Sequence, residues 1–508
     1  MGILDWISVG KLAAERDDNL TEYFFDNGVL SSVLGSPSSF LVLGRKGAGK
    51  TAVFNFLKQN PTRYLDASDV LISLTFEDYN WNVHALLQNP HAAESLAYKD
   101  SWRFVIYAEA LKAIAEWAGT AKIKLPKSVQ SANKIMASLF DSPTPSIYQL
   151  VGRKLLSLSK VKLPSAGVAL EDGSVEVNAG EVSFEEVQAE KSLQESLSNN
   201  VAGLIEILER AIDDCAGMPC RVFICFDRVD EAWDDVSFDV SRRVIAGLVG
   251  AADSITSKCS GKIRPIVFLR EDIFESLSLN DLNKLREDCG ALLHWDASSL
   301  YRMLLERVNF FASKAGIDAV DAVDDLFDKK EMRQRAKPST YMLRRTMMRP
   351  RDLISMLSKV IDSMKEAASD PFEETEVPVA ETLSTDAIYA AEPGYSEWLG
   401  AELIDEWAVQ NPTIRAYLNA LRSHGSTNIT RDEFEDELRK QGLDATAQVM
   451  DDALRFLFDN SVIGLKVGQS NIWKFKCVYP SQGFVACDVY HVHDGLIRGL
   501  GLKEPRGN

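Results

Sequence analysis

The chain has 508 residues, of which 46% are hydrophobic and 26% are charged, and its formal net charge is −18. Its length predicts roughly two to four domains. The acidic balance argues against a protein that coats nucleic acid, because phosphate contacts require basic faces. No apolar stretch reaches about 18 residues, so we expect no membrane span. The start of the chain lacks the pattern of a signal peptide. The seven cysteines include no CxxC pair, which predicts neither a zinc site nor a disulfide framework and favours the cytoplasm.

Residues 1–19 predict an N-terminal arm. Its apolar residues can share one face of a helix: Ile3, Leu4, Ile7 and Leu12. Such a face either packs on the chain's own domain or binds a partner. Residues 20–34 predict a helix that leads into a first strand, FLVL (40–43).

Further apolar runs have the length and composition of buried strands in a parallel sheet. They are VLISLTF (70–76), RVFICFD (221–227), PIVFL (265–269) and ALLHW (291–295). Helical patterns lie between them, so the fold class is α/β, with the sheet in residues 20–297. An insertion at about 100–213 is a candidate partner surface, and it holds a hairpin pattern at 161–184.

The sequence GRKGAGKT (44–51) matches the phosphate-loop pattern GxxxxGK[ST]. Glycines let the backbone wrap a phosphate chain that a Cβ would block, and the N–H groups of the loop and of the following helix face negative charge. Lys50 can reach the β- and γ-phosphates, and the Thr51 hydroxyl can ligate Mg²⁺. The alternative is a glycine-rich turn that binds no ligand. The expected nucleotide-binding residues are Gly44, Arg45, Lys46, Gly47, Ala48, Gly49, Lys50, Thr51 and Ala52.

The segment RVFICFDRVDE (221–231) supplies acids at the end of a buried strand. We expect Asp227 to hold Mg²⁺ through water. Either Asp230 or Glu231 can polarise the attacking water as a general base. The alternative is that these two acids only stabilise the start of a helix.

Three arginines are candidate contacts of a γ-phosphate. Arg270 follows the strand at 265–269, and ligands bind beyond the carboxyl ends of parallel strands. Its alternative role is a salt bridge with Glu271 or Asp272. Arg349 and Arg351 lie at a helix start, where basic residues are unfavourable unless an anion is near. That anion is either a nucleotide phosphate or an acidic side chain such as Asp352.

Residues 298–365 predict a helical lid. Residues 366–394 are acidic and contain three prolines, which predicts a linker. Residues 395–508 predict a winged-helix-like domain of short helices followed by a hairpin. Gly425 closes one of these helices, and Thr430 with Glu433 forms a capping box. In the third helix (445–459) acids predominate, which disfavours contact with a DNA backbone.

The pair His491 and His493 lies in a strand-like run, YHVH, where packing is the expected role of both imidazoles. A metal pair is the alternative.

With these motifs, the chain resembles bacterial P-loop ATPases of the broad STAND/AAA+ group, which includes the NACHT, KAP and origin-recognition ATPases. The resemblance covers about residues 20–500. It rests on GRKGAGKT, FDRVDE, Arg270 and RPRD, and it is closest to ATPases that also carry segments like SWRFVIYAEAL and YHVHDGLIRGL. It implies that Glu231 is the base. Many genes of this type lie beside antiphage defence genes, which implies a defence role. It also implies that the sensor and effector lie on partner proteins or in the insertion.

These features predict a regulatory ATPase that binds Mg²⁺ and ATP, hydrolyses ATP slowly and acts as a conformational or oligomerisation switch. We expect a homo-oligomer with a partner protein. ATP is favoured over GTP because no NKxD motif occurs. One alternative is a DNA-binding AAA+ initiator or loader that uses the winged helix. Another is a nucleotide-binding scaffold without turnover.

Overall fold

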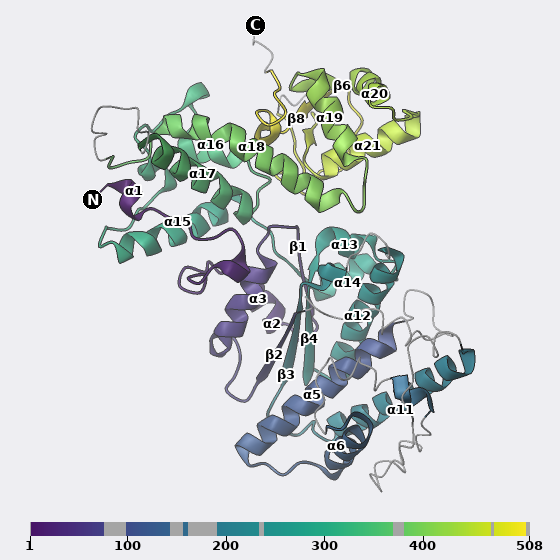
Figure 1. Ribbon diagram of the computed structural model, residues 1–508. Helices are drawn as coiled ribbons and strands as arrows, with labels where there is room; N and C mark the ends of the chain where they lie inside the picture. Colours follow the sequence, from purple (N-terminus) through teal and green to yellow (C-terminus); the bar gives the residue numbers. More distant parts are fainter. Residues whose placement is uncertain are drawn as a thin grey trace. The chain divides into compact units, whose positions relative to one another are not determined.

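The computed structural model describes residues 2–75, 98–142, 156–160, 190–232, 238–368, 380–468 and 472–503 (Figure 1). By their contacts they divide into two units. The C-terminal unit comprises Met1–Phe25, Lys46–Gly49 and His294–Asn508, and the sheet unit comprises Asp26–Arg45 and Lys50–Leu293. The predicted hairpin at 161–184 lies outside the described residues.

A parallel sheet of five strands, in the order β2-β3-β4-β1-β5, forms the centre of the sheet unit. Its strands are β1 (Leu41–Gly44), β2 (Val70–Thr75), β3 (Val222–Asp227), β4 (Ile263–Arg270) and β5 (Gly290–Leu292). The apolar runs therefore predicted every strand of this sheet, although β5 ends before His294. Every residue of β1 and β3 is buried, as expected for central parallel strands.

The register places the polar residues that follow these strands at one edge of the sheet. Gly44 is the partner of Arg270, and Asp227 is the partner of Thr75. Because all the strands are parallel, the phosphate loop and the acid of β3 leave the sheet at the same edge, where α/β proteins bind their ligands.

Helices pack around the sheet and make up the rest of the described sheet unit. The helices of the sheet unit are α2 (Val29–Gly35), α3 (Lys50–Gln59), α5 (Lys99–Ala121), α6 (Lys127–Phe140), α11 (Lys191–Asp213), α12 (Phe238–Lys258), α13 (Glu271–Ser276) and α14 (Leu282–Cys289). α5 packs against α11 and α12 (Figure 1). It buries Trp102, whose indole donates to the Val244 carbonyl at 2.9 Å and meets the Phe226 ring edge-on. The predicted helix at 101–118 lies within α5.

The lid part of the C-terminal unit contains α15 (Ala297–Lys314), α16 (Pro338–Arg344), α17 (Pro350–Ala368) and α18 (Thr385–Trp407). The N-terminal arm packs on this unit, since Arg307 of α15 donates to the Val9 carbonyl at 2.7 Å. The expected continuous helical face of the arm is wrong. Helix α1 (Ile3–Trp6) has only four residues, and Leu12 is 41% exposed.

Of the residues expected to form the linker, the structure describes a helix at each end and a non-helical stretch at 380–384. α17 continues to Ala368, and α18 begins at Thr385, where the Ser384 side chain caps it. Pro393, which suggested a break, lies inside α18. A proline within a helix costs about 3 kcal/mol, and the burial of Ile388, Tyr395 and other side chains of α18 offsets this cost.

The last part of the chain is a winged helix, as predicted. Its elements are α19 (Ile414–His424), β6 (Asn428–Thr430), α20 (Arg431–Lys440), α21 (Ala447–Asp459), β7 (Ile463–Gly464) and β8 (Val489–Val492). The strands form an antiparallel sheet in the order β6-β8-β7. Gly425 ends α19 with a φ of 75°, and Thr430 and Glu433 form the expected capping box.

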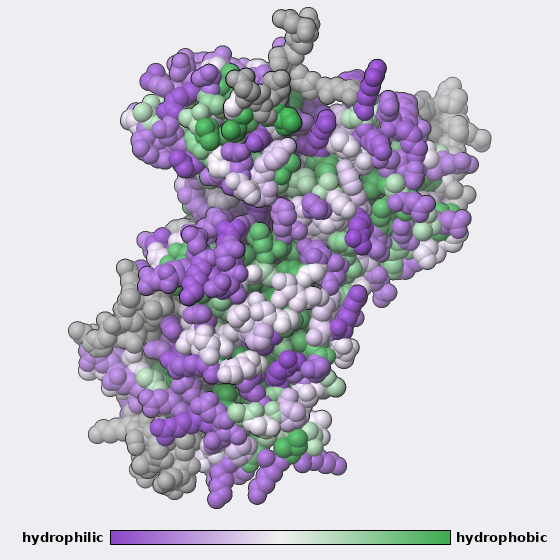
Figure 2. Space-filling model, turned by 180° about the vertical axis from the view of Figure 1, so that it is seen from behind, coloured by the Kyte–Doolittle hydropathy of each residue, from purple (hydrophilic) through white to green (hydrophobic). Residues whose placement is uncertain are grey.

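On the face shown in Figure 2, hydrophobic residues are interspersed with hydrophilic ones. Within the described residues, no helix has the length and apolar character needed to cross a bilayer.

Candidate nucleotide-binding site

The phosphate loop connects β1 to α3 and depends on two glycines in the left-handed region. Gly47 has a φ of 81° and Gly49 a φ of 99°, a conformation that costs a side-chain-bearing residue about 1–2 kcal/mol. A Cβ on Gly47 would also lie 3.3 Å from the Arg351 Cβ. The loop sequence is therefore required by the backbone as well as by the space around it. With the parallel sheet and the acid of β3, this loop defines a P-loop NTPase fold, to which the helical lid and the winged helix are attached.

Lys50 folds back on the start of the loop. Its ammonium donates to the Gly44 carbonyl at 2.9 Å and to the Arg45 carbonyl at 3.4 Å. Burial lowers the pKa of Lys50, while the charges of Asp230 and Asp227 act in the opposite direction. The ammonium thus lies at the carboxyl edge of the sheet among acids, where a phosphate chain would give it a further charge partner.

Asp227 is a buried acid with an unsatisfied oxygen. Its side chain ends β3 and is 2% exposed, and it accepts a hydrogen bond from Thr51. Its Oδ2 has no hydrogen-bond partner among the described residues. Burial raises the pKa of Asp227 to about 6, and Asp230 raises it as well, whereas Lys50 opposes the rise. Such an orphaned oxygen beside a threonine hydroxyl fits the shell of a hydrated Mg²⁺.

The backbone turns sharply after Asp227. Arg228 has a φ of 60°, and the next residue, Val229, is fully buried and starts the 3₁₀ helix η5 (Val229–Ala232). Strained backbone of this kind persists where the surrounding structure fixes it, often at functional sites. The turn brings Asp230 close enough to influence Lys50 and Asp227. The side chain of Glu231 lies outside the described residues, so its role as the base stays a prediction.

Arg270 forms the salt bridge that was the alternative to phosphate contact. Its Nη2 lies 2.8 Å from Asp272 Oδ2, and its Nε lies 3.1 Å from Asp272 Oδ1. Glu271 pairs with Arg286 instead. Arg270 nevertheless contributes to lowering the pKa of Lys50, which places its charge near the start of α3.

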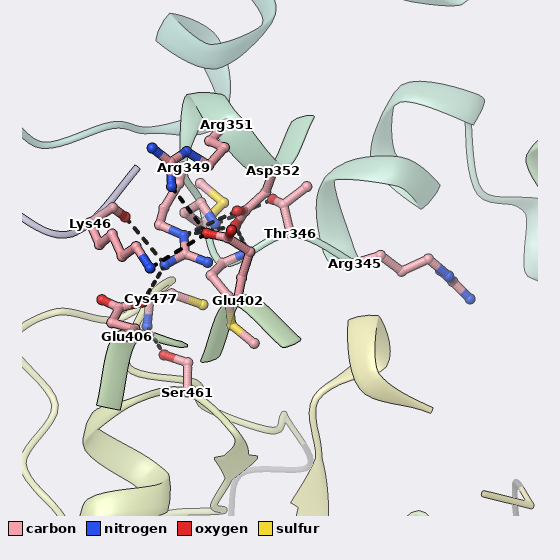
Figure 3. A network of polar contacts seen from close by, with 12 residues as sticks. Lys46, Arg345, Thr346, Arg349, Arg351, Asp352, Glu402, Glu406, Ser461 and Cys477 are labelled. Carbon is pink, nitrogen blue, oxygen red and sulfur yellow. Dashed lines mark hydrogen bonds and ion pairs between the residues drawn. The ribbon is translucent and has the colours of Figure 1, made fainter. Parts of the chain in front are cut away.

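Arg349 joins the tip of the phosphate loop to two acids (Figure 3). Its Nη1 donates to the Lys46 carbonyl at 3.2 Å and to Glu406 Oε2 at 2.9 Å, and its Nε lies 3.0 Å from Asp352 Oδ2. Arg349 is 5% exposed. Burial opposes the charge of Arg349, but Asp352 and Glu406 outweigh that effect and raise its pKa.

Arg351 and Lys46 share a second acid of α18. Glu402 Oε2 lies 3.0 Å from Arg351 Nη1 and 4.0 Å from Lys46 Nζ. Glu402 and Glu406 are four residues apart, so they lie on one face of α18. Arg345 extends away from this network in Figure 3 and pairs with Glu392 at 2.7 Å. Arg349 and Arg351, like Arg270, were predicted as phosphate contacts and pair with acids in this structure.

Sequence reasoning missed three residues around the loop tip. Glu402 and Glu406 form an acid pair at helical spacing, which could have indicated partners for basic residues. Their segment was instead assigned to the winged-helix-like domain. Trp295 carried none. Its indole Nε1 donates to the Ala48 carbonyl at 2.8 Å, and both residues are buried.

The two histidines of the winged helix pack as expected. His491 stacks on Trp473 with ring centroids 5.2 Å apart, and its Nδ1 lies 2.6 Å from Asn428 Oδ1. His493 is buried and accepts a hydrogen bond from the Gly495 amide. Burial lowers the pKa of His493 to about 4.

Comparisons with known proteins match parts of this arrangement. A family model described as the FunZ-associated C-terminal helical domain matches residues 298–404. The "Putative transposon gamma-delta 80.3 kDa protein" of Escherichia coli (strain K12) is 26% identical over 423 residues, which cover 82% of this chain and 53% of the relative. The chain thus spans about half the length of this curated relative.

Two solved structures are also similar along most of the chain. Cdc6p from Pyrobaculum aerophilum has a TM-score of 0.32 and 10% identity, with 94% of each chain covered. A structure of Drosophila ORC bound to DNA has a TM-score of 0.28 and 8% identity, with 93% of this chain and 82% of the other covered. The fold assignment is made from the order of the strands in the sheet and from the phosphate loop.

Proposed function

We propose that the chain is an ATPase that binds Mg²⁺ and ATP, hydrolyses ATP slowly, and uses the bound nucleotide to switch its C-terminal unit. The observation that carries this proposal is the pair of Thr51 and Asp227. A buried carboxylate with an orphaned oxygen is costly unless a ligand satisfies it. Here the pair adjoins a glycine-dependent phosphate loop, and Mg²⁺ is the ligand that both side chains would hold.

The chemistry assigns one role to each residue of the site. Lys50 and the loop amides neutralise the phosphates, and Thr51 with Asp227 holds Mg²⁺. Asp230 or Glu231 orients the attacking water. Arg270 provides a charge close to Lys50. Bound Mg²⁺ would draw charge from the phosphates and offset the cost of the ionised Asp227.

The switch depends on competition between carboxylates and phosphate. Arg349, Arg351 and Lys46 are cations that now pair with Glu402 and Glu406. A phosphate near the loop tip competes for the same cations and loosens α18. This helix also contacts the winged helix, because Trp407 meets the Phe456 ring at 5.4 Å and Ser396 accepts from the Gly499 amide at 2.7 Å. Loosening α18 would free a surface for self-assembly or for a partner protein.

A direct experiment measures binding of a fluorescent ATP analogue and competition by ATP, ADP and GTP. We expect saturable Mg²⁺-dependent binding that Lys50→Ala removes, with ATP preferred over GTP. Light scattering of the same samples gives the assembly state, and phosphate release gives the turnover. Wild-type protein that binds no nucleotide in Mg²⁺ would refute the proposal. Binding without turnover, and without any effect of Glu231→Gln, would reduce it to the scaffold alternative.

A second candidate function is a DNA-binding initiator or loader. The observation that favours it is the winged helix, in which two acids of α21 have partners among the described residues. Asp452 accepts from the neutral Gln448 side chain at 3.0 Å, and Asp451 pairs with Arg431. The charge of Arg431 offsets that of Asp451, so this part of the helix repels phosphate less than the acids of α21 alone suggest. Turnover stimulated by duplex DNA, together with salt-dependent DNA affinity, would support this candidate. DNA-independent turnover would exclude it.

The biological setting that we propose is bacterial antiphage defence, with a sensor or effector on a partner protein. The sequence resemblance supports this setting. Plating efficiency of phages on cells with wild-type or Lys50→Ala protein, expressed together with the neighbouring genes, tests it. Equal plating on both strains for a broad phage panel would count against it.

A further inference from the structure

Three successive carbonyl groups at the tip of the phosphate loop are held by donors of the C-terminal unit. The Lys46 carbonyl accepts from Arg349 Nη1 at 3.2 Å, and the Gly47 carbonyl accepts from the Arg351 amide at 3.5 Å. The Ala48 carbonyl accepts from Trp295 Nε1 at 2.8 Å.

Peptide geometry converts these contacts into a direction for the amide groups. The described peptide bonds include no cis bond. In a planar trans peptide, the carbonyl and the following N–H point to opposite sides. Holding the carbonyls of Lys46, Gly47 and Ala48 therefore points the amides of the next residues, Gly47, Ala48 and Gly49, to the opposite side of each peptide. In a loop of this pattern, those amides face the phosphates.

Trp295 makes the shortest of the three contacts, and within the described part of the chain its Nε1 donates only to the Ala48 carbonyl. Arg349 also contacts Asp352 and Glu406, and the Arg351 amide makes the longest of the three contacts. An indole Nε1 can only donate, and Trp295 is 7% exposed. Its ring packs against the Phe25 ring, with centroids 6.0 Å apart. The guanidinium carbon of Arg302 lies 5.1 Å from the centroid of the same Phe25 ring. The indole is therefore fixed in position before it meets the loop.

The place of Trp295 in the chain ties the loop to a lid helix. The next residue, Asp296, is the N-cap of α15 and accepts from the Ser299 amide at 2.7 Å. Because the cap fixes the start of α15, any displacement of that helix displaces the indole and with it the Ala48 carbonyl.

We infer that Trp295 is a positioning residue for phosphate binding, which orients the loop amides through the Ala48 carbonyl and couples them to α15. The inference rests on the proposed nucleotide site and adds to it a residue outside the loop motif. The competing explanation is that Trp295 only fills space in the core of its unit.

The test compares two substitutions that each remove one buried indole hydrogen bond. Trp295→Phe keeps an aromatic ring against Phe25 and loses the donor to Ala48. Trp102→Phe is the matched control, because Trp102 is fully buried and donates to the Val244 carbonyl at 2.9 Å in the sheet unit. Inorganic triphosphate is the probe beside Mg·ADP, since the effect concerns phosphate alone. Trp295→Phe should lower the affinity for both ligands about five- to tenfold, which is the scale of one neutral hydrogen bond. Trp102→Phe should leave both affinities unchanged.

Each outcome decides between the claims. Equal affinities for wild type and Trp295→Phe overturn the inference and leave the proposed function intact. Equal losses in both variants identify a stability effect and also overturn the inference. Wild-type protein that binds neither ligand overturns the proposed function and the inference with it.

A measurement on the unmodified protein covers the case in which Trp295→Phe does not fold. Indole hydrogen exchange of Trp295 should slow when triphosphate binds, whereas that of Trp102 should not change. Exchange of Trp295 that is indifferent to triphosphate, in protein that binds it, overturns the inference.

Discussion

Replacing Asp227 with asparagine should stabilise the protein and at the same time remove its response to Mg²⁺. Asp227 is 2% exposed, and burial raises its pKa from 3.8 to about 6. Below about pH 4 the carboxyl is protonated in both the folded and the unfolded chain. As pH rises through 6, the folded chain must ionise a buried group, so it loses stability. Each tenfold difference in proton affinity is worth about 1.4 kcal/mol, which makes the loss about 3 kcal/mol.

Asp227→Asn keeps the shape of the side chain and its ability to accept from Thr51, but it carries no charge. In EDTA and without nucleotide, we expect its free energy of unfolding to exceed that of wild type by up to about 3 kcal/mol at pH 8. The gain should shrink as pH falls from 6 towards 4. Thermal and denaturant unfolding across this pH range measures it. Nucleotide binding by the variant should no longer strengthen when Mg²⁺ is added.

Asp69→Asn is the matched control with the opposite sign. Asp69 accepts from Arg221 Nε at 2.9 Å, and although burial opposes the effect, this contact lowers its pKa. Its asparagine variant should therefore lose stability at pH 8. Destabilisation of Asp227→Asn at pH 8, or Mg²⁺ dependence that survives in it, would refute the reasoning about Asp227.

Three further perturbations follow from the same contacts. Glu406→Gln should lower the free energy of unfolding of the C-terminal unit by about 3 kcal/mol, because it breaks a buried pair with Arg349. It should also tighten ATP binding. Unfolding curves and calorimetry measure the two effects, and unchanged ATP affinity would contradict the competition between Glu406 and phosphate for Arg349. Gly47→Ala should abolish detectable binding of ATP because of its φ of 81° and the Arg351 Cβ at 3.3 Å, and full binding would show that the loop relaxes. His493, whose pKa burial lowers to about 4, should make the winged helix lose about 3 kcal/mol as pH falls from 6.5 to 4. Amide exchange across β8 measures this loss, and a flat profile would contradict it.

The fold was predictable where local signals were strong. Each strand of the large sheet contains a short apolar run, and the loop after β1 has glycines at positions that need a left-handed backbone. Gly425 and Thr430 likewise marked helix ends through chemistry that acts within one turn. Pro393 misled because its helix is stabilised by tertiary burial, which a single segment does not reveal.

The site was predictable in its residue types and less so in its pairings. Lys50, Thr51 and Asp227 follow from a motif whose spacing fixes their places. The choice of Arg270 between Glu271 and Asp272 depends on side-chain direction at the end of β4. Trp295 donates to the Ala48 carbonyl, and Glu406 reaches the loop tip through Arg349, both from distant segments. No pattern around Trp295 indicates its contact, and the spacing of Glu402 and Glu406 indicates a shared helix face but not the partner of that face.

Hydrogen exchange of the full chain, with and without Mg·ATP, tests the proposed switch most directly. We expect ATP to slow exchange in the phosphate loop (44–51) and to speed it in the last turns of α18, which carry Glu402 and Glu406. Lys50→Ala should show neither change. Protection of the loop with no change in α18 would contradict the switch, and no change in either segment would contradict nucleotide binding itself.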